Sequence, residues 1–154
     1  MEDVNPSIRI IIAIFSGALG VAFFHEPVVA IMHLIHLTPQ HAYPLTPTIP
    51  LWMPAISSRI FWGGVWGIFL AFATAKQTSG RLFWRRALLF GAVLISLVGW
   101  TAVSAAKFEP LFDGFHVGEL ITDVVANGAW GLGTAFFIRI FSFATVRWAG
   151  VSLT

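Results

Sequence analysis

The stretches GVWGIFLAF at Gly64–Phe72 and GAWGLGTAF at Gly128–Phe136 share the pattern GxWGxxxAF, and each lies within a long apolar run. A second correspondence precedes them. Five residues before the first glycine of the pattern stands Arg59 in one copy and Asp123 in the other. The two stretches therefore predict a duplicated two-helix unit in which one charge is exchanged between the halves.

A third shared pattern lies upstream of each copy. Glu26-Pro27 and Glu109-Pro110 are each followed, six residues after the proline, by a histidine, at His33 and His116. Proline ends or restarts a helix, and the residue before it avoids the helical region. We therefore expect each Glu-Pro pair to mark the point where a helix leaves the bilayer. The halves of the repeat then cover about residues 8–75 and 87–141.

The composition is that of a polytopic membrane protein. Of the 154 residues, 57% are hydrophobic and 10% are charged, and the mean hydropathy is +0.82. Soluble domains carry about 25% charged residues. The net charge of +2 requires no nucleic-acid partner, and the absence of cysteine excludes disulfides and thiolate sites.

A bilayer core of about 30 Å requires about 20 helical residues. The apolar runs that satisfy this length lie at about residues 8–26, 54–75, 87–106 and 117–141. The sequence thus predicts an all-α membrane protein with four transmembrane helices, arranged as a parallel two-helix repeat in a single domain over residues 1–154.

The lysine and arginine residues predict the orientation. All of the nine except Arg59 and Lys107 fall at the same set of span ends. By the positive-inside rule, that side faces the cytoplasm together with both termini and the loop Lys76–Arg86.

The segment between the first two spans has its own character. Val28–Leu37 is apolar but too short to cross a bilayer, so we expect a short interfacial helix there. Thr38–Pro54 is rich in proline, which disfavours helix and favours extended chain. This external loop is either a docking surface or a plain connector.

The repeated motif has a packing explanation. Membrane helices associate through close approach at small residues, and a tryptophan deep in a span usually packs in the protein interior. We expect the motif to serve helix packing, with the lining of a ligand cavity as the alternative. Its residues are Gly64, Trp66, Gly67, Gly128, Trp130 and Gly131.

Arg59 and Asp123 are charged residues within apolar helices, where charge is costly. Equivalent positions of a pseudo-twofold repeat can face each other across the axis, so we predict an Arg59–Asp123 ion pair within the membrane. Such a pair either fixes the helix register or lies beside a pathway for protons or ions.

Several titratable residues fall at the outer level of the spans. His116, Glu119 and Asp123 share one helical face, and the repeat places His25, Glu26 and His33 at the same level. Imidazole and carboxylate groups suit a transition metal, and they could also relay protons. Ligation of a haem by two of the histidines is a further alternative. Histidine is also common at a membrane interface without any such role, so no cofactor is expected.

The runs FHEPV at Phe24–Val28 and FWGGVWG at Phe61–Gly67, separated by the proline-rich loop, resemble small four-helix inner-membrane proteins of proteobacteria. The resemblance implies four spans and a location in the bacterial inner membrane. It implies no activity and no functional residue.

The sequence contains no nucleophile elbow, phosphate loop or dinucleotide fingerprint. We therefore expect a non-enzymatic inner-membrane protein, an accessory or structural subunit that packs in the lipid bilayer with another membrane protein or with itself. The alternatives are a small transporter or channel with Arg59 and Asp123 near its pathway, and a redox subunit that carries a metal or haem.

Overall fold

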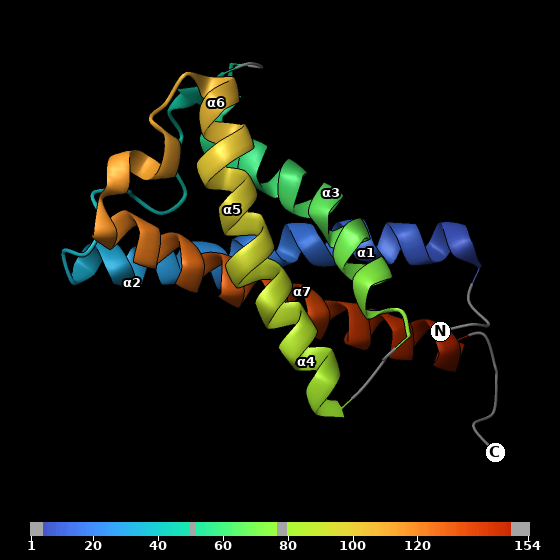
Figure 1. The fold of residues 1–154 in the computed structure, drawn as a ribbon. Helices are drawn as coiled ribbons and strands as arrows, with labels where there is room; N and C mark the ends of the chain where they lie inside the picture. The colour runs from blue at the N-terminus through green and yellow to red at the C-terminus, as the bar shows by residue number, and fades with distance from the viewer. Residues whose placement is uncertain (1–4, 50–51, 77–79, 149–154) are drawn as a thin grey trace.

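The computed structural model describes residues 5–49, 52–76 and 80–148. These residues form four helical rods that are long and apolar enough to cross a membrane, as the sequence predicts (Figure 1). The rods cover Pro6–Leu34, Ala55–Thr74, Gly80–Lys107 and Val117–Thr145. The ends of the first and last rods that lead to the chain termini lie at the same end of the molecule (Figure 1).

The first rod passes through Pro27 without a break. It consists of α1 (Pro6–Gly20), a π-helical turn η1 (Val21–His25) and α2 (Glu26–Leu34). Proline lacks an N–H and its ring crowds the preceding turn, and the wider π turn directly before Pro27 makes room for both. The helix therefore does not break at Glu26-Pro27, where we expected the first span to end. The expected separate short helix at Val28–Leu37 is also wrong, because the first rod continues through this segment to Leu34.

The third rod also contains π-helical turns, and the fourth is a single helix. The third rod ends at Lys107, and Glu109-Pro110 follows it in a loop. Its parts are α4 (Gly80–Leu89), η2 (Phe90–Ile95), α5 (Ser96–Val98), η3 (Gly99–Val103) and α6 (Ser104–Lys107). A 3-10 turn, η4 (Leu111–Phe115), leads to α7 (Val117–Trp148).

The first and third rods end in the same way. His36 and Phe108 have φ angles of 59° and 60°, in the left-handed region. Around His36 the backbone bonds run from His36 N to His33 O and from Leu37 N to Met32 O. This is a Schellman motif, which satisfies the last carbonyls of a helix. Phe108 makes the corresponding bond to Ala105 O, and Glu109 N bonds to Ser104 O.

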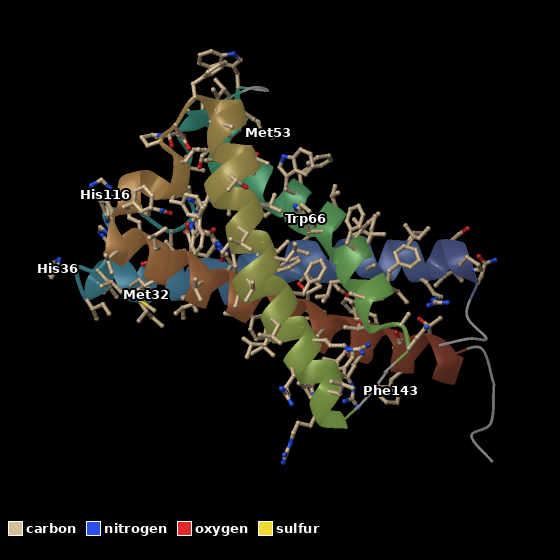
Figure 2. The ribbon with its side chains drawn as sticks, viewed as in Figure 1. Met32, His36, Met53, Trp66, His116 and Phe143 are labelled. Atoms are coloured by element: carbon tan, nitrogen blue, oxygen red, sulfur yellow. The ribbon has the colours of Figure 1, made fainter. Side chains whose placement is uncertain are left out.

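The proline-rich segment is extended, as expected, and forms a small hairpin before α3 (Ala55–Thr74). Its strands β1 (Pro47–Thr48) and β2 (Met53–Pro54) pair antiparallel, with Pro47 opposite Pro54. We call the end of the molecule that carries this hairpin and the loop after α6 the loop end. His36, Met53 and His116 lie there, whereas Phe143 lies toward the opposite end (Figure 2).

α1 and α3 cross at glycines. A Cβ added to Gly17 would overlap the carbonyl group of Gly63, and one added to Gly67 would overlap the carbonyl oxygen of Ala13. Only glycine allows the two backbones to come this close, and close approach of this kind is how small residues join membrane helices.

The third rod crosses α7 in the same way. A Cβ added to Gly91 would overlap the carbonyl group of Asn127, and one added to Gly131 would overlap the carbonyl oxygen of Ala87. In this second crossing, Gly91 takes the place of Gly17 and Gly131 takes the place of Gly67.

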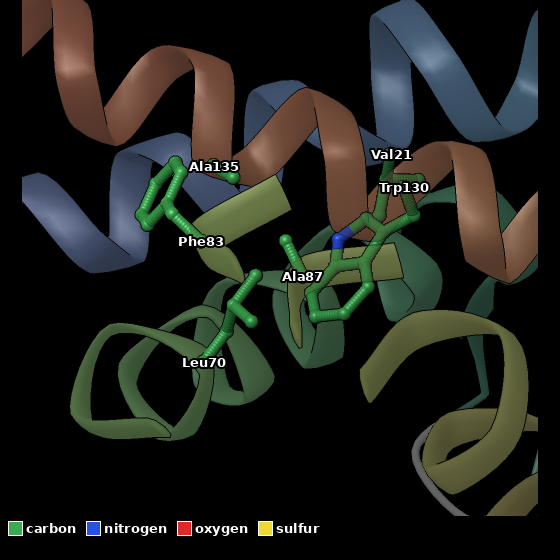
Figure 3. Packing of buried hydrophobic residues seen from close by; sticks show 6 residues of the cluster. All are labelled: Val21, Leu70, Phe83, Ala87, Trp130 and Ala135. Carbon is green, nitrogen blue, oxygen red and sulfur yellow. The ribbon is translucent and has the colours of Figure 1, made fainter. Parts of the chain in front are cut away.

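The middle of the bundle is filled by a hydrophobic cluster around Trp130, which is 3% exposed (Figure 3). The indole N–H of Trp130 donates to the carbonyl oxygen of Gly17 at 3.0 Å. Trp66 is half-buried at the edge of this cluster, with its ring centroid 6.4 Å from that of Phe90. The motif tryptophans thus both pack in the bundle, and Trp130 packs more deeply.

Candidate functional site

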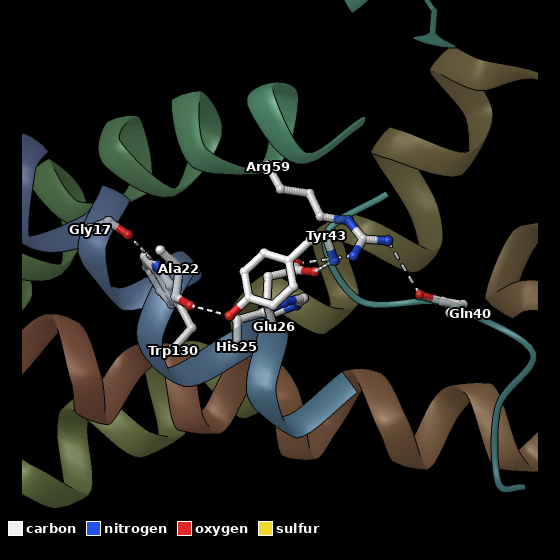
Figure 4. A network of polar contacts seen from close by, with 8 residues as sticks. All are labelled: Gly17, Ala22, His25, Glu26, Gln40, Tyr43, Arg59 and Trp130. Atoms are coloured by element: carbon white, nitrogen blue, oxygen red, sulfur yellow. Dashed lines mark hydrogen bonds and ion pairs between the residues drawn. The ribbon is translucent and has the colours of Figure 1, made fainter. Parts of the chain in front are cut away.

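The most deeply buried charge in the described residues belongs to Glu26, whose side chain is 0% exposed. Its carboxylate accepts the backbone N–H of Tyr43 at 2.6 Å and Nη1–H of Arg59 at 3.0 Å (Figure 4). The Nδ1 atom of His25 lies 3.1 Å from Oε1 of the same carboxylate. A buried carboxylate is tolerated only when it is paired and hydrogen-bonded. These three partners meet that requirement.

The network joins three parts of the chain that are distant in sequence. Nη2 of Arg59 donates to Oε1 of Gln40 at 3.4 Å, and the hydroxyl of Tyr43 donates to the carbonyl oxygen of Ala22 at 2.8 Å. Gln40 and Tyr43 belong to the proline-rich segment, Arg59 to α3, and Glu26 to the first rod (Figure 4). The Glu26–Arg59 pair therefore binds the proline-rich segment to α3 and to the first rod.

The structure corrects the expected partner of Arg59. Its ion pair is with Glu26, and the described residues contain no direct ion pair between Arg59 and Asp123. Asp123 instead accepts a hydrogen bond from the indole N–H of Trp100 at 2.8 Å. The prediction had placed the contact across the pseudo-twofold axis. Both polar contacts lie within a pair of crossing helices, because helices that cross at glycines bring their nearby side chains together.

These two contacts stand at matching places. Glu26 follows Gly17 by nine residues, and Trp100 follows Gly91 by nine. Their partners match too, since Arg59 precedes Gly67 by eight residues and Asp123 precedes Gly131 by eight. Each pair of crossing helices therefore carries one polar contact at the same distance from its glycine crossing, on the side of the loop end.

A polar cleft of about 510 Å³ opens at the loop end. Arg59 and Asp123 both line it, so the structure brings these two residues to one cleft although they do not pair directly. The remaining lining comes from the proline-rich segment, the end of the third rod, the loop after it and the first turn of α7. Those residues are Gln40, Gly99, Val103, Ser104, Lys107, Glu109, Pro110, His116 and Glu119.

The histidines and carboxylates expected in one metal or proton site are divided among separate groups. His25 lies beside Glu26, and Nδ1 of His116 lies 3.6 Å from Oε1 of Glu119. His33 has its Nδ1 3.1 Å from Thr38 O, and its ring centroid lies 4.1 Å from that of His41. In the part of the chain that the structure describes, no three His, Cys, Asp or Glu residues are grouped as a metal site would need.

Sequence reasoning missed several residues of the site. Gln40 and Tyr43 lie among prolines in an extended segment, and nothing in the local pattern directs them toward Glu26. Trp100 could have been found from the sequence, because an alignment of the two halves on Gly17 and Gly91 places Trp100 at the position equivalent to Glu26. The alignment on the Glu-Pro pairs concealed this relation.

Comparison of this chain with family models, with curated proteins and with solved structures finds no match. The function must therefore be argued from the geometry of this molecule.

Proposed function

We propose that this chain is a non-enzymatic integral membrane protein of the bacterial inner membrane. In this proposal it acts by binding, as an accessory or structural subunit that packs with another membrane protein or with itself. The observation that carries it is the high exposure of four large apolar side chains at the loop end, outside the four candidate spans. Leu45 and Trp52 are each 75% exposed, Phe115 is 74% exposed and Phe108 is 93% exposed.

Contiguous exposed apolar patches mark interaction surfaces, and in this proposal the four side chains contribute to one. An aromatic belt at the bilayer surface is the competing explanation for the tryptophan and phenylalanines. The bundle interior favours a binding role over conduction, since the glycine crossings and Trp130 fill its middle.

The charges support an orientation in which both termini face the cytoplasm. Arg81 and Arg85 lie at the start of the third rod, at the end opposite the loop end, and Lys76 follows the last residue of the second rod. With these residues in the cytoplasm, the cleft and the hairpin face the periplasm.

We also infer that the fold arose by duplication of a two-helix unit. The matching glycine crossings and the matching polar contacts, Glu26 with Arg59 and Trp100 with Asp123, support this inference. The first helices of both units would run outward and the second helices inward, so the units would be parallel, with their axis along the membrane normal.

The subunit proposal is tested by the oligomeric state. The full chain is purified in a mild detergent, and its mass is measured by light scattering. In a second sample the chain is crosslinked in membranes before purification, and its mass is measured in the same way. We expect an oligomer of this chain or a stable complex with another membrane protein. Phe108→Gln and Trp52→Gln should weaken this assembly, and the exposed control Arg85→Gln should leave it intact. A strictly monomeric, partner-free protein in both settings would contradict the proposal.

A transporter is the second candidate, because Arg59 and Asp123 line one cleft at the loop end. An outward-facing carrier has this form. Proton flux into proteoliposomes, followed with a pH-sensitive dye, should then be abolished by Asp123→Asn while expression is unchanged. The third alternative, a metal- or haem-bearing redox subunit, is tested by the absorbance spectrum and elemental analysis of the purified protein.

A further inference from the structure

The end of the molecule opposite the loop end, where Phe143 lies, is strongly basic (Figure 2). Its cations in the described part of the chain are Arg9, Lys76, Arg81, Arg85, Arg86 and Arg139. The carboxylates of the described residues belong instead to the half of the molecule at the loop end, and they are Glu26, Glu109, Asp113, Glu119 and Asp123. Glu2 and Asp3 lie outside the described residues. Within the part that the structure describes, none of the six cations forms an ion pair.

Arg139 is held inside the fourth span by two aromatic rings. It precedes Thr145, the last residue of that span, by six residues, or about 9 Å along the helix. Its Cζ atom lies 5.9 Å from the ring centroid of Trp84 and 5.7 Å from that of Phe143. Such contacts attract the charge. Among the described residues, no acceptor takes up the N–H donors of the guanidinium. The positive-inside rule explains basic residues beyond a span, but it does not explain one held between rings within it.

Arg81 lies on the same face of α4 as Trp84. It precedes Trp84 by three residues, and residues three apart are neighbours on the surface of a helix. Trp84 therefore has Arg81 beside it on α4 and Arg139 over its ring from α7. The first turn of α4 contains no acidic residue, although the partial positive charge at a helix N-terminus favours one. An anion beside Trp84 would compensate the two arginines and this helix terminus together.

These side chains lie at the depth of the lipid headgroups. The third rod has 28 residues and is about 42 Å long at 1.5 Å per residue. The apolar core is about 30 Å thick, so about four residues at each end of the rod extend beyond it. Arg81 is the second residue of the rod, whereas Leu88, on the face of Trp84, is exposed within the apolar core. A phosphate that carries an acyl chain contacts both levels, and a soluble anion or an acidic peptide contacts only the first.

We propose that Arg81 and Arg139 bind the phosphate of an anionic phospholipid such as phosphatidylglycerol, beside Trp84, with an acyl chain along Leu88. The phosphodiester of this lipid carries a negative charge that no ammonium group compensates. A zwitterionic lipid carries its own cation, which the arginines would repel. This ligand is additional to the protein partner proposed above.

The test measures the binding of lipids to the delipidated full chain in detergent by native mass spectrometry. The probes are dioleoyl-phosphatidylglycerol, the phosphatidylcholine with the same acyl chains, and soluble glycerophosphoglycerol. We expect phosphatidylglycerol to bind at least about tenfold more tightly than phosphatidylcholine, because each basic residue beside an anionic lipid contributes about a fivefold factor in affinity. Glycerophosphoglycerol has no acyl chain and should not displace the lipid at equal concentration.

The variants Arg81→Gln and Arg139→Gln should each weaken the binding of phosphatidylglycerol about fivefold and leave the binding of phosphatidylcholine nearly unchanged. Arg86→Gln is the matched control, because Arg86 lies on the same helix but two residues from Trp84, and residues two apart do not face each other. The same loss of charge there should change the affinity by less than about twofold. Circular dichroism reports whether each variant is folded. Arg81 is exposed, so Arg81→Gln tests the site even if Arg139→Gln disturbs the packing of Trp84.

Equal affinity of the parent chain for the two lipids would overturn the proposal. An equal loss of affinity in Arg86→Gln and Arg81→Gln would also overturn it, because the lipid would then respond to net charge alone. Displacement of phosphatidylglycerol by glycerophosphoglycerol at equal concentration would overturn the choice of a lipid over a soluble phosphodiester. Because the method resolves the masses of monomer and oligomer separately, failure of the subunit proposal would be seen independently of the lipid result.

Discussion

Arg59 in α3 and Glu26 in the first rod form an ion pair of 3.0 Å in which the glutamate side chain is fully buried and the arginine side chain is 30% exposed. Because Glu26 is buried and Arg59 is partly exposed, removing the charge of one residue has a different effect on stability from removing the charge of the other. Loss of Arg59 leaves a buried carboxylate without its cation, whereas loss of the charge on Glu26 leaves an arginine that can still reach water.

We therefore expect Arg59→Gln to lower the free energy of unfolding by about 3 kcal/mol, the usual result of removing one partner of a buried pair. Glu26→Gln should lower it less, since the neutral amide removes the need for a counter-charge. Unfolding is followed by circular dichroism during titration with a denaturing detergent.

The double variant Arg59→Gln with Glu26→Gln distinguishes pairing from general damage. It should recover part of the loss caused by Arg59→Gln, because residues in direct contact are not additive. Simple addition of the two single losses would show that the pair does not couple α3 to the first rod.

The glycine crossings give a prediction with a built-in comparison. A Cβ at Gly17 or Gly91 would overlap a backbone carbonyl of the facing helix, whereas one at Gly99 has no atom within 4 Å. Gly17→Ala and Gly91→Ala should each lower the free energy of unfolding by about 1–3 kcal/mol through overpacking. Gly99→Ala should be neutral or slightly stabilising, since alanine favours helix. Equal changes in the free energy of unfolding at the three sites would show that helix propensity, and not the close approach of the helices, determines the effect of alanine.

The length and hydropathy of the apolar runs predicted the four long helices, because these two properties determine which segments can cross a bilayer. The prediction from the sequence was less successful in detail. It failed at Pro27, where a π turn absorbs the missing donor. A turn of that kind depends on the packing around it, and proline by itself signals only a break.

Of the site residues singled out from the sequence, Arg59, Asp123, His116 and Glu119 line one cleft. The Arg59–Asp123 pairing was predicted wrongly, because it assumed contact across the pseudo-twofold axis. Arg59 and Asp123 each contact the partner rod of their own crossing pair, at Glu26 and at Trp100. The contacts of Tyr43 with Glu26 and Ala22 depend on the path of an extended segment, which no periodicity encodes.

Trp130 allows packing and hydrogen bonding to be separated. Its N–H donates to Gly17 O, and interhelical hydrogen bonds in membranes contribute about 0.6 kcal/mol on average. Truncation of a buried tryptophan to alanine costs about 3–5 kcal/mol. We expect Trp130→Phe to be mild and Trp130→Ala to be severe in the same unfolding assay. A severe loss in Trp130→Phe would show that the hydrogen bond dominates.

The backbone N–H of Tyr43 gives a local probe of the network, because it donates to the buried Glu26 at 2.6 Å. Its hydrogen exchange should be slow for a residue in an extended segment. Glu26→Gln weakens the acceptor and should accelerate exchange at Tyr43. Tyr43→Phe should preserve slow exchange at this position, since it removes only the hydroxyl bond to Ala22 O. Fast exchange in the parent chain would contradict the contact.

The orientation can be measured cleanly because the natural chain contains no cysteine. Leu45 is 75% exposed in the proline-rich segment, and Arg85 is exposed at the start of the third rod. If the basic ends face the cytoplasm, Leu45→Cys in intact spheroplasts should react with a membrane-impermeant maleimide. Arg85→Cys should react only after the membrane is opened. The reverse pattern would place the cleft on the cytoplasmic side and would break the positive-inside rule.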